Sequence, residues 1–466
     1  MTDLSTLAKR LLNRDYELWP KNSVAPNRLG WLDVPKLIAS QAKEITSWAD
    51  GIEQDQVVLL GMGGSSLGPA VLESVLSNYS IHSHKPRPNR RKLNVLDTTD
   101  PSTIASTDFE NSFMIVSSKS GSTLEVHTLL SYAMSRVSDP KRYCAITDPG
   151  TELETLASEK GFSKCWINPS DIGGRYSVMS YFGMIPAALI GYDVEELSNL
   201  ALDCDIEEAV ALGHDMGTQA LAGRDKVTIQ VAKNYSSFGL WVEQIIAEST
   251  GKLGKGCIPV PTTLSESGED RLHVNIELTK PSDLANQFYR WELATPIAGH
   301  VLQIDPFDEP NVAESKHNTN EVLGALPLTQ LPTNPPKALG EFLTNNIRQG
   351  DYVSIQAYLP FGQDESLEAL RTCISQEHNS IAVTAGYGPR FLHSTGQLHK
   401  GGPNSIIAIQ LVPANSEPVV EIPNYPYDFA TLKAAQSIGD FKSLQSHERR
   451  VLRIAVEAIT EKGDLI

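Results

Sequence analysis

The chain has 466 residues and a mass of 50.9 kDa, about two to three times the usual size of one domain, so more than one hydrophobic core is expected. Its 41% hydrophobic and 20% charged residues are typical of a globular protein, and no apolar run reaches the roughly 18 residues that a membrane span requires. The formal net charge of -17 argues against partners such as nucleic acid or anionic lipid. A site for a phosphate ester would have to be a local exception, built from backbone N–H groups and a few cations.

The segment Met1–Arg14 places acidic Asp3 near Lys9 and Arg10 and lacks the long apolar run of a signal peptide. We therefore expect a soluble, cytoplasmic protein. The five cysteines are scattered, odd in number and without a CxxC pair, which argues against a disulfide framework or a zinc site.

The first half alternates short apolar runs with helical segments, the pattern of a doubly wound parallel sheet. Strands are expected at Val57–Leu60, Leu93–Leu96, Phe113–Val116 and Tyr143–Thr147. Helices are expected at Ala70–Asn78, at Thr123–Ser135, at Ser177–Gly191 with a kink or break at Pro186, and at Val194–Gly213 as a linker helix. We place a domain boundary near residue 200.

The second half begins with another strand and an amphipathic helix that ends at Gly251. Strands are expected at Val227–Ala232, Leu272–Leu278, Tyr352–Leu359, Ile381–Thr384 and Ile406–Leu411; helices at Ser237–Ser249, Phe429–Gln436 and His447–Thr460; and a surface loop at Pro327–Gly340. The sequence thus predicts an α/β protein of two domains, 1–200 and 201–466, with mainly parallel sheets in three αβα layers.

Two loops carry the composition of an anion site. Gly61–Gly68, with Gly64 and Ser65 at its centre, follows an apolar strand and opens a helix, which brings several N–H groups to the carboxyl edge of the sheet. It matches neither the GxGxxG fingerprint nor the Walker lysine loop, and a tight turn with close helix packing explains it equally well.

The second loop, Ser117–Thr123, also lies between a strand and a helix and supplies five hydroxyls and one lysine within seven residues. Hydroxyls and N–H groups at a helix start suit a phosphate monoester that is held without being cleaved. A polar loop with a helix cap is the alternative, but two such loops on neighbouring strands favour a phosphate site.

Two further segments could supply catalytic groups. Arg175 follows two glycines, and a fixed, always protonated guanidinium suits a site where negative charge develops. Gln244 and Glu248 are four residues apart and project from one helix face, and the flanking apolar residues could raise the pKa of a carboxylate that acts as a base. A solvated arginine and a solvated glutamate remain the plain alternatives.

Lys316 and His393 are the last candidates, because both side chain types can move protons near neutral pH. Neither is diagnostic alone, and His393 and His399 lack the surrounding carboxylates of a metal site.

Taken together, the Gly-Gly-Ser loop, the Ser-Lys-Ser loop, Gly-Gly-Arg-Tyr-Ser, Glu-Ser-x-Gly-Lys and a lysine-bearing helix resemble the glucose-6-phosphate isomerase (phosphoglucose isomerase) family from about residue 45 onward. The resemblance implies two sugar-isomerase (SIS) domains, an enzyme without cofactor or metal, and a homodimer in which the partner subunit supplies the histidine. It implies that the phosphate is held by Gly64, Ser65, Ser118, Lys119, Ser120 and Thr123.

The same resemblance implies roles for the other candidates. Arg175 would stabilise an enediolate, Gln244 would position the substrate, and Glu248 would be the base that moves a proton between C2 and C1. Lys316 and His393 would assist ring opening.

Two features depart from the family pattern. Lys316 precedes His393, whereas in the ordinary family the lysine helix comes last. That order, and the segment Leu392–Gly402, resemble the isomerase half of bifunctional transaldolase/glucose-6-phosphate isomerase proteins, although no transaldolase fits in this chain. Glu309 stands where the family usually has a glutamine, and an added carboxylate should weaken phosphate binding unless it is paired or turned away.

The resemblance predicts the reversible conversion of D-glucose 6-phosphate and D-fructose 6-phosphate through a cis-enediol, in glycolysis and gluconeogenesis. Two alternatives stay open: an isomerase that also accepts mannose 6-phosphate, and a non-catalytic sugar-phosphate-binding SIS protein. A sensor of that kind could dispense with Arg175, Glu248 and His393, all of which are present.

Overall fold

The first half of the chain folds around a five-stranded parallel sheet. A computed structural model describes residues 3–83, 91–457 and 459. The strand order is β2-β1-β3-β4-β5, so the chain leaves the centre in both directions, as a doubly wound sheet requires. The strands are β1 (Gln56–Gly61), β2 (Lys92–Leu96), β3 (Ser112–Ser117), β4 (Tyr143–Thr147) and β5 (Lys164–Ile167).

This sheet is covered by helices on both faces. Alternate residues of β1 enter two different cores. Val57 and Leu59 pack with helices α2 (Val34–Asp50), α3 (Leu67–Ser83) and α7 (Tyr181–Leu189), whereas Val58 and Leu60 pack with α5 (Leu124–Arg136), α6 (Glu152–Lys160) and α16 (Phe429–Ser446). The central strands are buried on both faces and are therefore continuously apolar, which is why they could be predicted from the sequence. The predicted three-layer αβα arrangement is confirmed.

The second half contains two smaller parallel sheets. One has the order β7-β6-β8 and the other β10-β9-β11-β12. Strands β7 and β10 lie next to each other, and side chains of both enter one apolar cluster. The strands are β6 (Lys226–Val231), β7 (Ile258–Thr262), β8 (Arg271–Ile276), β9 (Tyr352–Ala357), β10 (Ala382–Tyr387), β11 (Ile406–Pro413) and β12 (Arg450–Val456).

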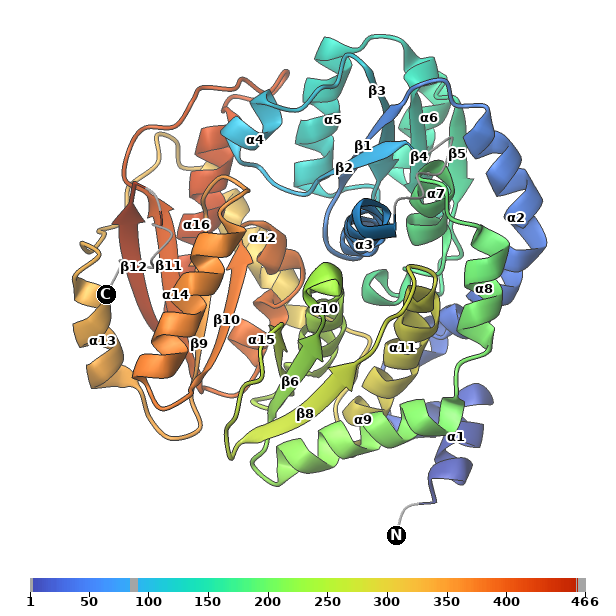
Figure 1. Ribbon diagram of the computed structural model, residues 1–466. Helices are drawn as coiled ribbons and strands as arrows, with labels where there is room; N and C mark the ends of the chain where they lie inside the picture. Colours follow the sequence, from blue (N-terminus) through green and yellow to red (C-terminus); the bar gives the residue numbers. More distant parts are fainter. Residues whose placement is uncertain (1–2, 84–90, 458, 460–466) are drawn as a thin grey trace.

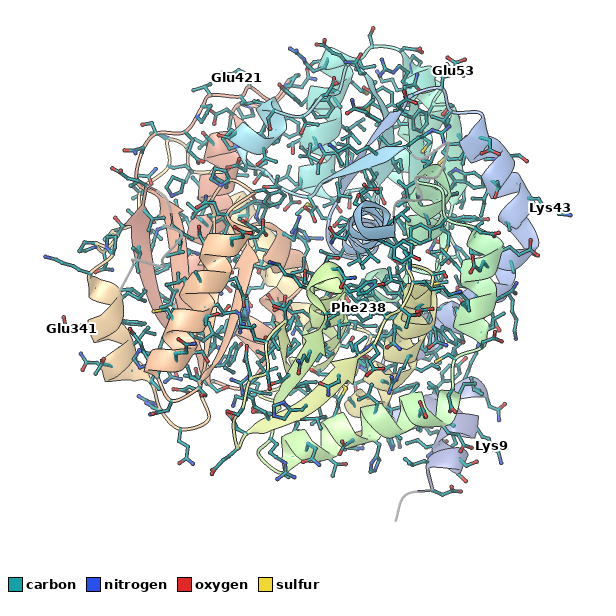
Figure 2. All side chains as sticks on the ribbon, viewed as in Figure 1. Lys9, Lys43, Glu53, Phe238, Glu341 and Glu421 are labelled. Carbon is teal, nitrogen blue, oxygen red and sulfur yellow. The ribbon has the colours of Figure 1, made fainter. Side chains whose placement is uncertain are left out.

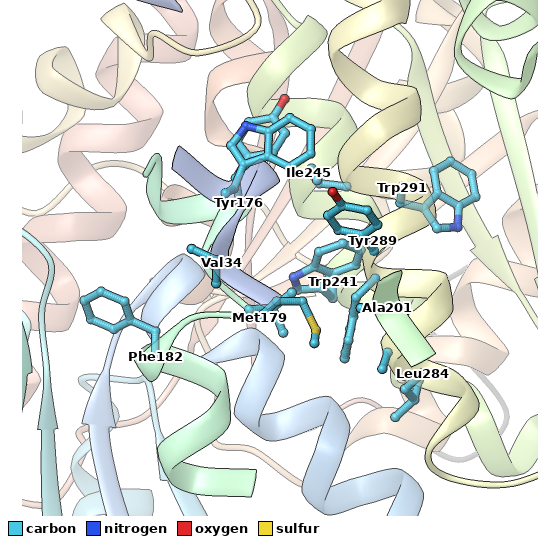
Figure 3. Packing of buried hydrophobic residues seen from close by; sticks show 14 of the residues in the cluster. Val34, Tyr176, Met179, Phe182, Ala201, Trp241, Ile245, Leu284, Tyr289 and Trp291 are labelled. Carbon is cyan, nitrogen blue, oxygen red and sulfur yellow. The ribbon is translucent and has the colours of Figure 1, made fainter. Parts of the chain in front are cut away.

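Helix α10 joins the two halves. It lies between the five-stranded sheet and the second-half sheets in Figure 1, and it contacts α3, α11, α15 and β7. Its side chains Trp241 and Ile245 are fully buried beside Tyr289 of α11, as Figure 3 shows. This burial fixes the position of α10 along its axis and its rotation about that axis. The side chains on the opposite face of the helix are therefore fixed as well.

The helices follow the sheets in chain order. Their bounds are α1 (Leu4–Leu12), α2 (Val34–Asp50), α3 (Leu67–Ser83), α4 (Pro101–Ala105), α5 (Leu124–Arg136), α6 (Glu152–Lys160), α7 (Tyr181–Leu189), α8 (Val194–Leu202), α9 (Ile206–Leu221), α10 (Phe238–Thr250), α11 (Asp283–Leu302), α12 (Pro310–Leu323), α13 (Ala338–Asn346), α14 (Asp364–Glu377), α15 (Gly396–Gly401) and α16 (Phe429–Ser446). No helix in the described ranges is both long and apolar enough to cross a membrane. Figure 2 shows Lys9, Lys43 and Glu341 at the rim and Phe238 in the interior.

Two predicted elements differ from the structure, and some elements, β7 among them, were not predicted. The helix predicted at His447–Thr460 is wrong: residues 450–456 form β12, whose β-branched residues pair with β11, while positions 458 and 460 lie outside the described residues. The predicted linker helix is two helices, since Asp205 caps a new start at α9. Strand β7 was missed because its two prolines disguise it. The proposed division near residue 200 stays a prediction.

We predict that Gly213→Ala destabilises the fold. A Cβ atom at Gly213 of α9 would lie 2.0 Å from the carbonyl oxygen of Ala294 in α11, so the two helices would have to separate. Overpacking of this kind lowers the free energy of unfolding by about 1–3 kcal/mol, which denaturant unfolding would measure. Gly51→Ala is the control, because its Cβ would meet only an ordinary contact at 3.4 Å. Equal stability of the two variants would contradict the prediction.

Candidate functional site

The glycine loop, Gly61–Gly68, is the joint at which distant segments meet. Gly63 has φ +57°, a conformation that favours glycine, and a Cβ there would lie 2.7 Å from the carbonyl oxygen of His393. A Cβ at Gly64 would lie 1.9 Å from the carbonyl oxygen of Gly174. The glycines are therefore needed for close approach of the His393 and Arg175 segments as well as for a turn.

The serine loop, Ser117–Thr123, lies against the glycine loop. The hydroxyl of Ser117 donates to the carbonyl of Ser65 at 3.1 Å, and the hydroxyls of Ser118 and Thr123 are 3.2 Å apart. Both loops follow neighbouring strands, β1 and β3, at the point where the winding of the sheet changes direction. Ligands bind at this position in doubly wound sheets.

Two residues of the serine loop are more exposed than Ser117 and Ser118. Ser120 is exposed, and its hydroxyl accepts a hydrogen bond from the backbone N–H of Ser122 at 3.3 Å. Lys119 is half-buried and forms an ion pair with Asp148 at the end of β4. A phosphate held by Lys119 would have to share this lysine with that carboxylate.

Arg175 is fully buried below the glycine loop, with 1% of its side chain exposed. Its Nη2 donates to the carbonyls of Phe307 and Asp308, each at 3.1 Å, and to Glu309 Oε2 at 2.6 Å. Its Nη1 lies 3.8 Å from Glu248 Oε1, and neither Nη1 nor Nε has a hydrogen-bond partner among the described residues. One edge of the guanidinium is thus saturated, while the other is available for an acceptor that the protein does not supply.

Glu248 projects from the last turn of α10 and is 12% exposed. Burial raises the pKa of Glu248; the charge of Arg175 opposes this rise and that of Glu309 adds to it. Gln244, one turn earlier, donates from Nε2 to Glu248 Oε2 at 3.1 Å and to the carbonyl of His393 at 2.9 Å. The predicted shared face of Gln244 and Glu248 is therefore present.

The carboxylate of Glu309, which would weaken phosphate binding if it were unpaired, is paired. It binds Arg175, and its side chain is 46% exposed. The preceding segment is held from the other side by Lys252, whose Nζ donates to the carbonyl of Asp305 at 2.6 Å and forms an ion pair with Asp308. Burial, reinforced by the charge of Arg175, lowers the pKa of Lys252 to about 8.

His393 meets a carboxylate of the serine-loop helix. Its Nε2 lies 2.9 Å from Glu125 Oε1, and Gln436 of α16 donates to the same oxygen at 2.7 Å. Burial alone would raise the pKa of Glu125, but the charge and hydrogen bond of His393 lower it to about 2. The carboxylate therefore stays ionised and fixes the imidazole.

Lys316 lies across a small cavity from this pair. The cavity has a volume of about 100 Å³ and is lined by Lys316, His393, Glu125 and residues of α12 and α16. Lys316 is exposed, and its charge contributes to the low pKa of Glu125. The two residues predicted to assist ring opening are thus brought together.

All of these groups come from one chain. The resemblance implies a histidine from a partner subunit, whereas His393 here contacts Glu125, Gly63 and Gln244 of its own chain. The reason lies in the altered order of segments: His393 follows β10, and the short 3-10 helix Arg390–His393 leads directly back to the glycine loop.

The comparisons with known proteins agree with this geometry. The family model described as phosphoglucose isomerase matches residues 40–206. A glucose-6-phosphate isomerase of Bacillus cereus (strain AH187) is 30% identical over 407 residues, which cover 66% of this chain and 89% of the relative. The chain belongs to the phosphoglucose isomerase family.

Other similar proteins point the same way. A glucose-6-phosphate isomerase of Bacillus cytotoxicus is 27% identical over 409 residues, 66% of this chain and 89% of the relative. A crystal structure of a glucose-6-phosphate isomerase from Chlamydia trachomatis matches with a TM-score of 0.50 and 16% identity, covering 73% of this chain and 80% of that one. This structural likeness supports the predicted SIS-type fold.

Several residues of the site were not predicted from the sequence. Glu125 follows the serine loop by two residues, and a buried carboxylate at a helix start was the available signal. Lys252 closes the quoted Glu-Ser-x-Gly-Lys motif but received no role. Gln436 had no local signal, because only the packing of α16 brings it to Glu125. Within the described ranges, no group of His, Cys, Asp and Glu side chains could hold a metal ion.

We predict that Glu125→Gln flattens the dependence of stability on acid pH. A carboxylate whose pKa falls from 4.5 to about 2 on folding stabilises the protein above pH 4.5, and this stability is lost as pH falls towards 2. Between pH 5 and pH 3 the parent should lose about 2 kcal/mol through this group, and the variant should not. Denaturant unfolding at several pH values measures the difference. Exposed Glu152→Gln should keep the parent slope, and a parent slope in Glu125→Gln would refute the assignment.

Proposed function

We propose that the protein interconverts D-glucose 6-phosphate and D-fructose 6-phosphate through a cis-enediol. The observation that carries the proposal is the unsaturated edge of Arg175, which faces Glu248 in a buried site. A base and a fixed cation at one place suit proton abstraction next to a carbonyl, because the anion that forms is stabilised where it forms. Family membership and the names of the relatives support the same reaction.

The phosphate end of the substrate would bind the two loops. Gly64, Ser65, Ser118, Lys119, Ser120 and Thr123 are the proposed contacts. N–H groups and hydroxyls bind a dianion without a large positive field, which fits a chain with a net charge of -17. In this proposal the substrate phosphate competes with Asp148 for Lys119.

At the other end, Glu248 would carry a proton between C2 and C1. Burial brings the pKa of Glu248 closer to neutral pH, and a group with such a pKa can accept and return a proton efficiently. Arg175 would stabilise the enediolate through Nη1 and Nε, while its Nη2 stays anchored to the segment 307–309. Gln244 would keep the substrate and Glu248 in register.

Ring opening would use His393 and Lys316. Glu125 orients the imidazole of His393 through the 2.9 Å contact to Nε2, which leaves the other ring nitrogen, Nδ1, for the substrate. Lys316 offers an exposed ammonium on the opposite side of the small cavity. The pair could protonate and deprotonate the ring oxygen and the O1 hydroxyl.

The remaining parts of the proposal concern setting and partners. We propose a cytoplasmic enzyme of glycolysis and gluconeogenesis that forms a homodimer, and a closer kinship with the isomerase half of bifunctional transaldolase/glucose-6-phosphate isomerase proteins. In this proposal each chain uses its own His393, so such a dimer would not need to exchange catalytic residues.

The first functional prediction concerns the base. In a coupled assay on fructose 6-phosphate, Glu248→Gln should lower kcat by about 10²–10⁴-fold with little change in KM, because it removes proton transfer but not the contacts of the phosphate. Glu243→Gln on the same helix is the matched control: burial raises the pKa of Glu243 to about 8, so a neutral amide replaces a largely neutral group and activity should persist. Normal turnover by Glu248→Gln would remove the assigned base, and no turnover by the parent would favour the sensor. Turnover of mannose 6-phosphate would show the broader isomerase.

The second functional prediction concerns the source of the histidine. Glu248→Gln and His393→Ala are each inactive in the proposal, and their co-refolded mixture should stay inactive because each chain contains only its own defective site. If subunits exchanged the histidine, half of the dimers would be hybrids with one intact site, and about a quarter of parental activity would return. Recovery at that level would overturn the cis assignment.

A further inference from the structure

A second cavity lies at the carboxyl edge of the four-stranded sheet. Its volume is about 910 Å³, within the range of small-molecule sites. It is lined by Tyr358 after β9, by residues 412–415 at the end of β11, by β12, and by the first half of α16. The loop 326–333 forms its outer wall.

The position of this cavity repeats that of the glycine and serine loops. In the order β10-β9-β11-β12 the chain moves from β9 to one side and from β11 to the other, so the winding changes direction between these two strands. The first sheet changes direction between β1 and β3, where the two loops of the candidate site lie. Each sheet thus has an opening at the place where doubly wound sheets bind ligands.

The cavity contains a buried cation that has no direct ion pair. Arg453 of β12 is 4% exposed and lines the cavity; its Nη2 donates to Ser437 at 3.1 Å and its Nη1 to Gln410. Its Nε has no hydrogen-bond partner, and in the described part of the chain no carboxylate forms a direct ion pair with it. The charge of buried Asp440 acts on Arg453 from a greater distance, but Asp440 is itself paired with Lys400 at 2.7 Å. Burial lowers the pKa of Arg453 to about 10, so the group is still charged at neutral pH.

The other charged groups in the lining compensate one another. Lys433 of α16 binds Asp100 at 2.7 Å and also pairs with Glu417. Burial raises the pKa of Glu417, and the charge of Lys433 opposes this rise. Hydroxyls of Thr431 and Ser437 and the amide of Asn415 complete a polar lining. The lining therefore holds two cations and one carboxylate in a chain whose net charge is -17.

We propose that this cavity is a second binding site, separate from the glycine and serine loops, for a small molecule that carries a phosphate group. Arg453 supplies the charge, and Thr431 and Asn415 supply hydrogen-bond donors. A buried guanidinium that has no direct ion pair is stabilised when an anion reaches it, and arginine suits phosphate oxygens because its donors form a fixed fork.

Inorganic phosphate is the probe, and calorimetric titration at low ionic strength is the measurement. The background is Ser120→Glu, which adds a carboxylate to the exposed part of the serine loop and so removes phosphate from the first site. This background should still bind one phosphate per chain. Adding Thr431→Glu should weaken that binding at least about tenfold, because a carboxylate then shares the lining of the cavity with Arg453 and repels the anion. Thr344→Glu, the same change on exposed helix α13, should leave affinity within about twofold.

Arg453→Met is the second variant and should abolish the remaining binding, with circular dichroism and unfolding used to verify that it folds. Loss of all phosphate binding in Ser120→Glu alone would overturn the proposal, as would equal affinities of the Thr431→Glu and Thr344→Glu variants. The test measures binding and not turnover, so its outcome is independent of the proposed isomerase activity.

Discussion

The buried guanidinium of Arg175 is the interaction on which the candidate site depends. A charge with 1% of its side chain exposed must be compensated by fixed partners, and here they are two carbonyls and one carboxylate on Nη2. These partners belong to the segment 307–309, which is held by Lys252, two residues after the end of α10. The cation is therefore oriented before any ligand arrives, and its free edge is directed at Glu248.

The strands and loops of the first half could be predicted because their signals are local. A parallel strand covered on both faces is a continuous apolar run, and a loop that ends it at a helix start is visible in a few residues. The residues that complete the site are different in kind. Glu125 meets His393 across 268 positions and Gln436 across 311, and no local pattern reports such a contact.

The failures in the second half have physical causes as well. The two basic residues of β12, Arg450 and Arg453, are three positions apart among apolar residues, a spacing that also fits one face of a helix. Only the pairing with β11 makes the segment a strand. The sequence shows that the lysine segment precedes the histidine segment. It could not show that this order brings His393 to the glycine loop of its own chain. His393 reaches the glycine loop of its own chain because β10 packs in one apolar cluster with α10, and α10 contacts α3 of the first half.

Helix α16 gives the molecule one further property. Gln436 binds Glu125 at the small cavity, while Lys433 and Ser437 line the large one, so a single helix of 18 residues forms part of the wall of both. A rigid wall cannot move for one occupant without moving for the other. If a ligand in the large cavity shifts α16, thermodynamic reciprocity requires that occupation of the small cavity alter the affinity of the large one by the same factor. Helix α16 would then couple the binding of two ligands that do not contact each other.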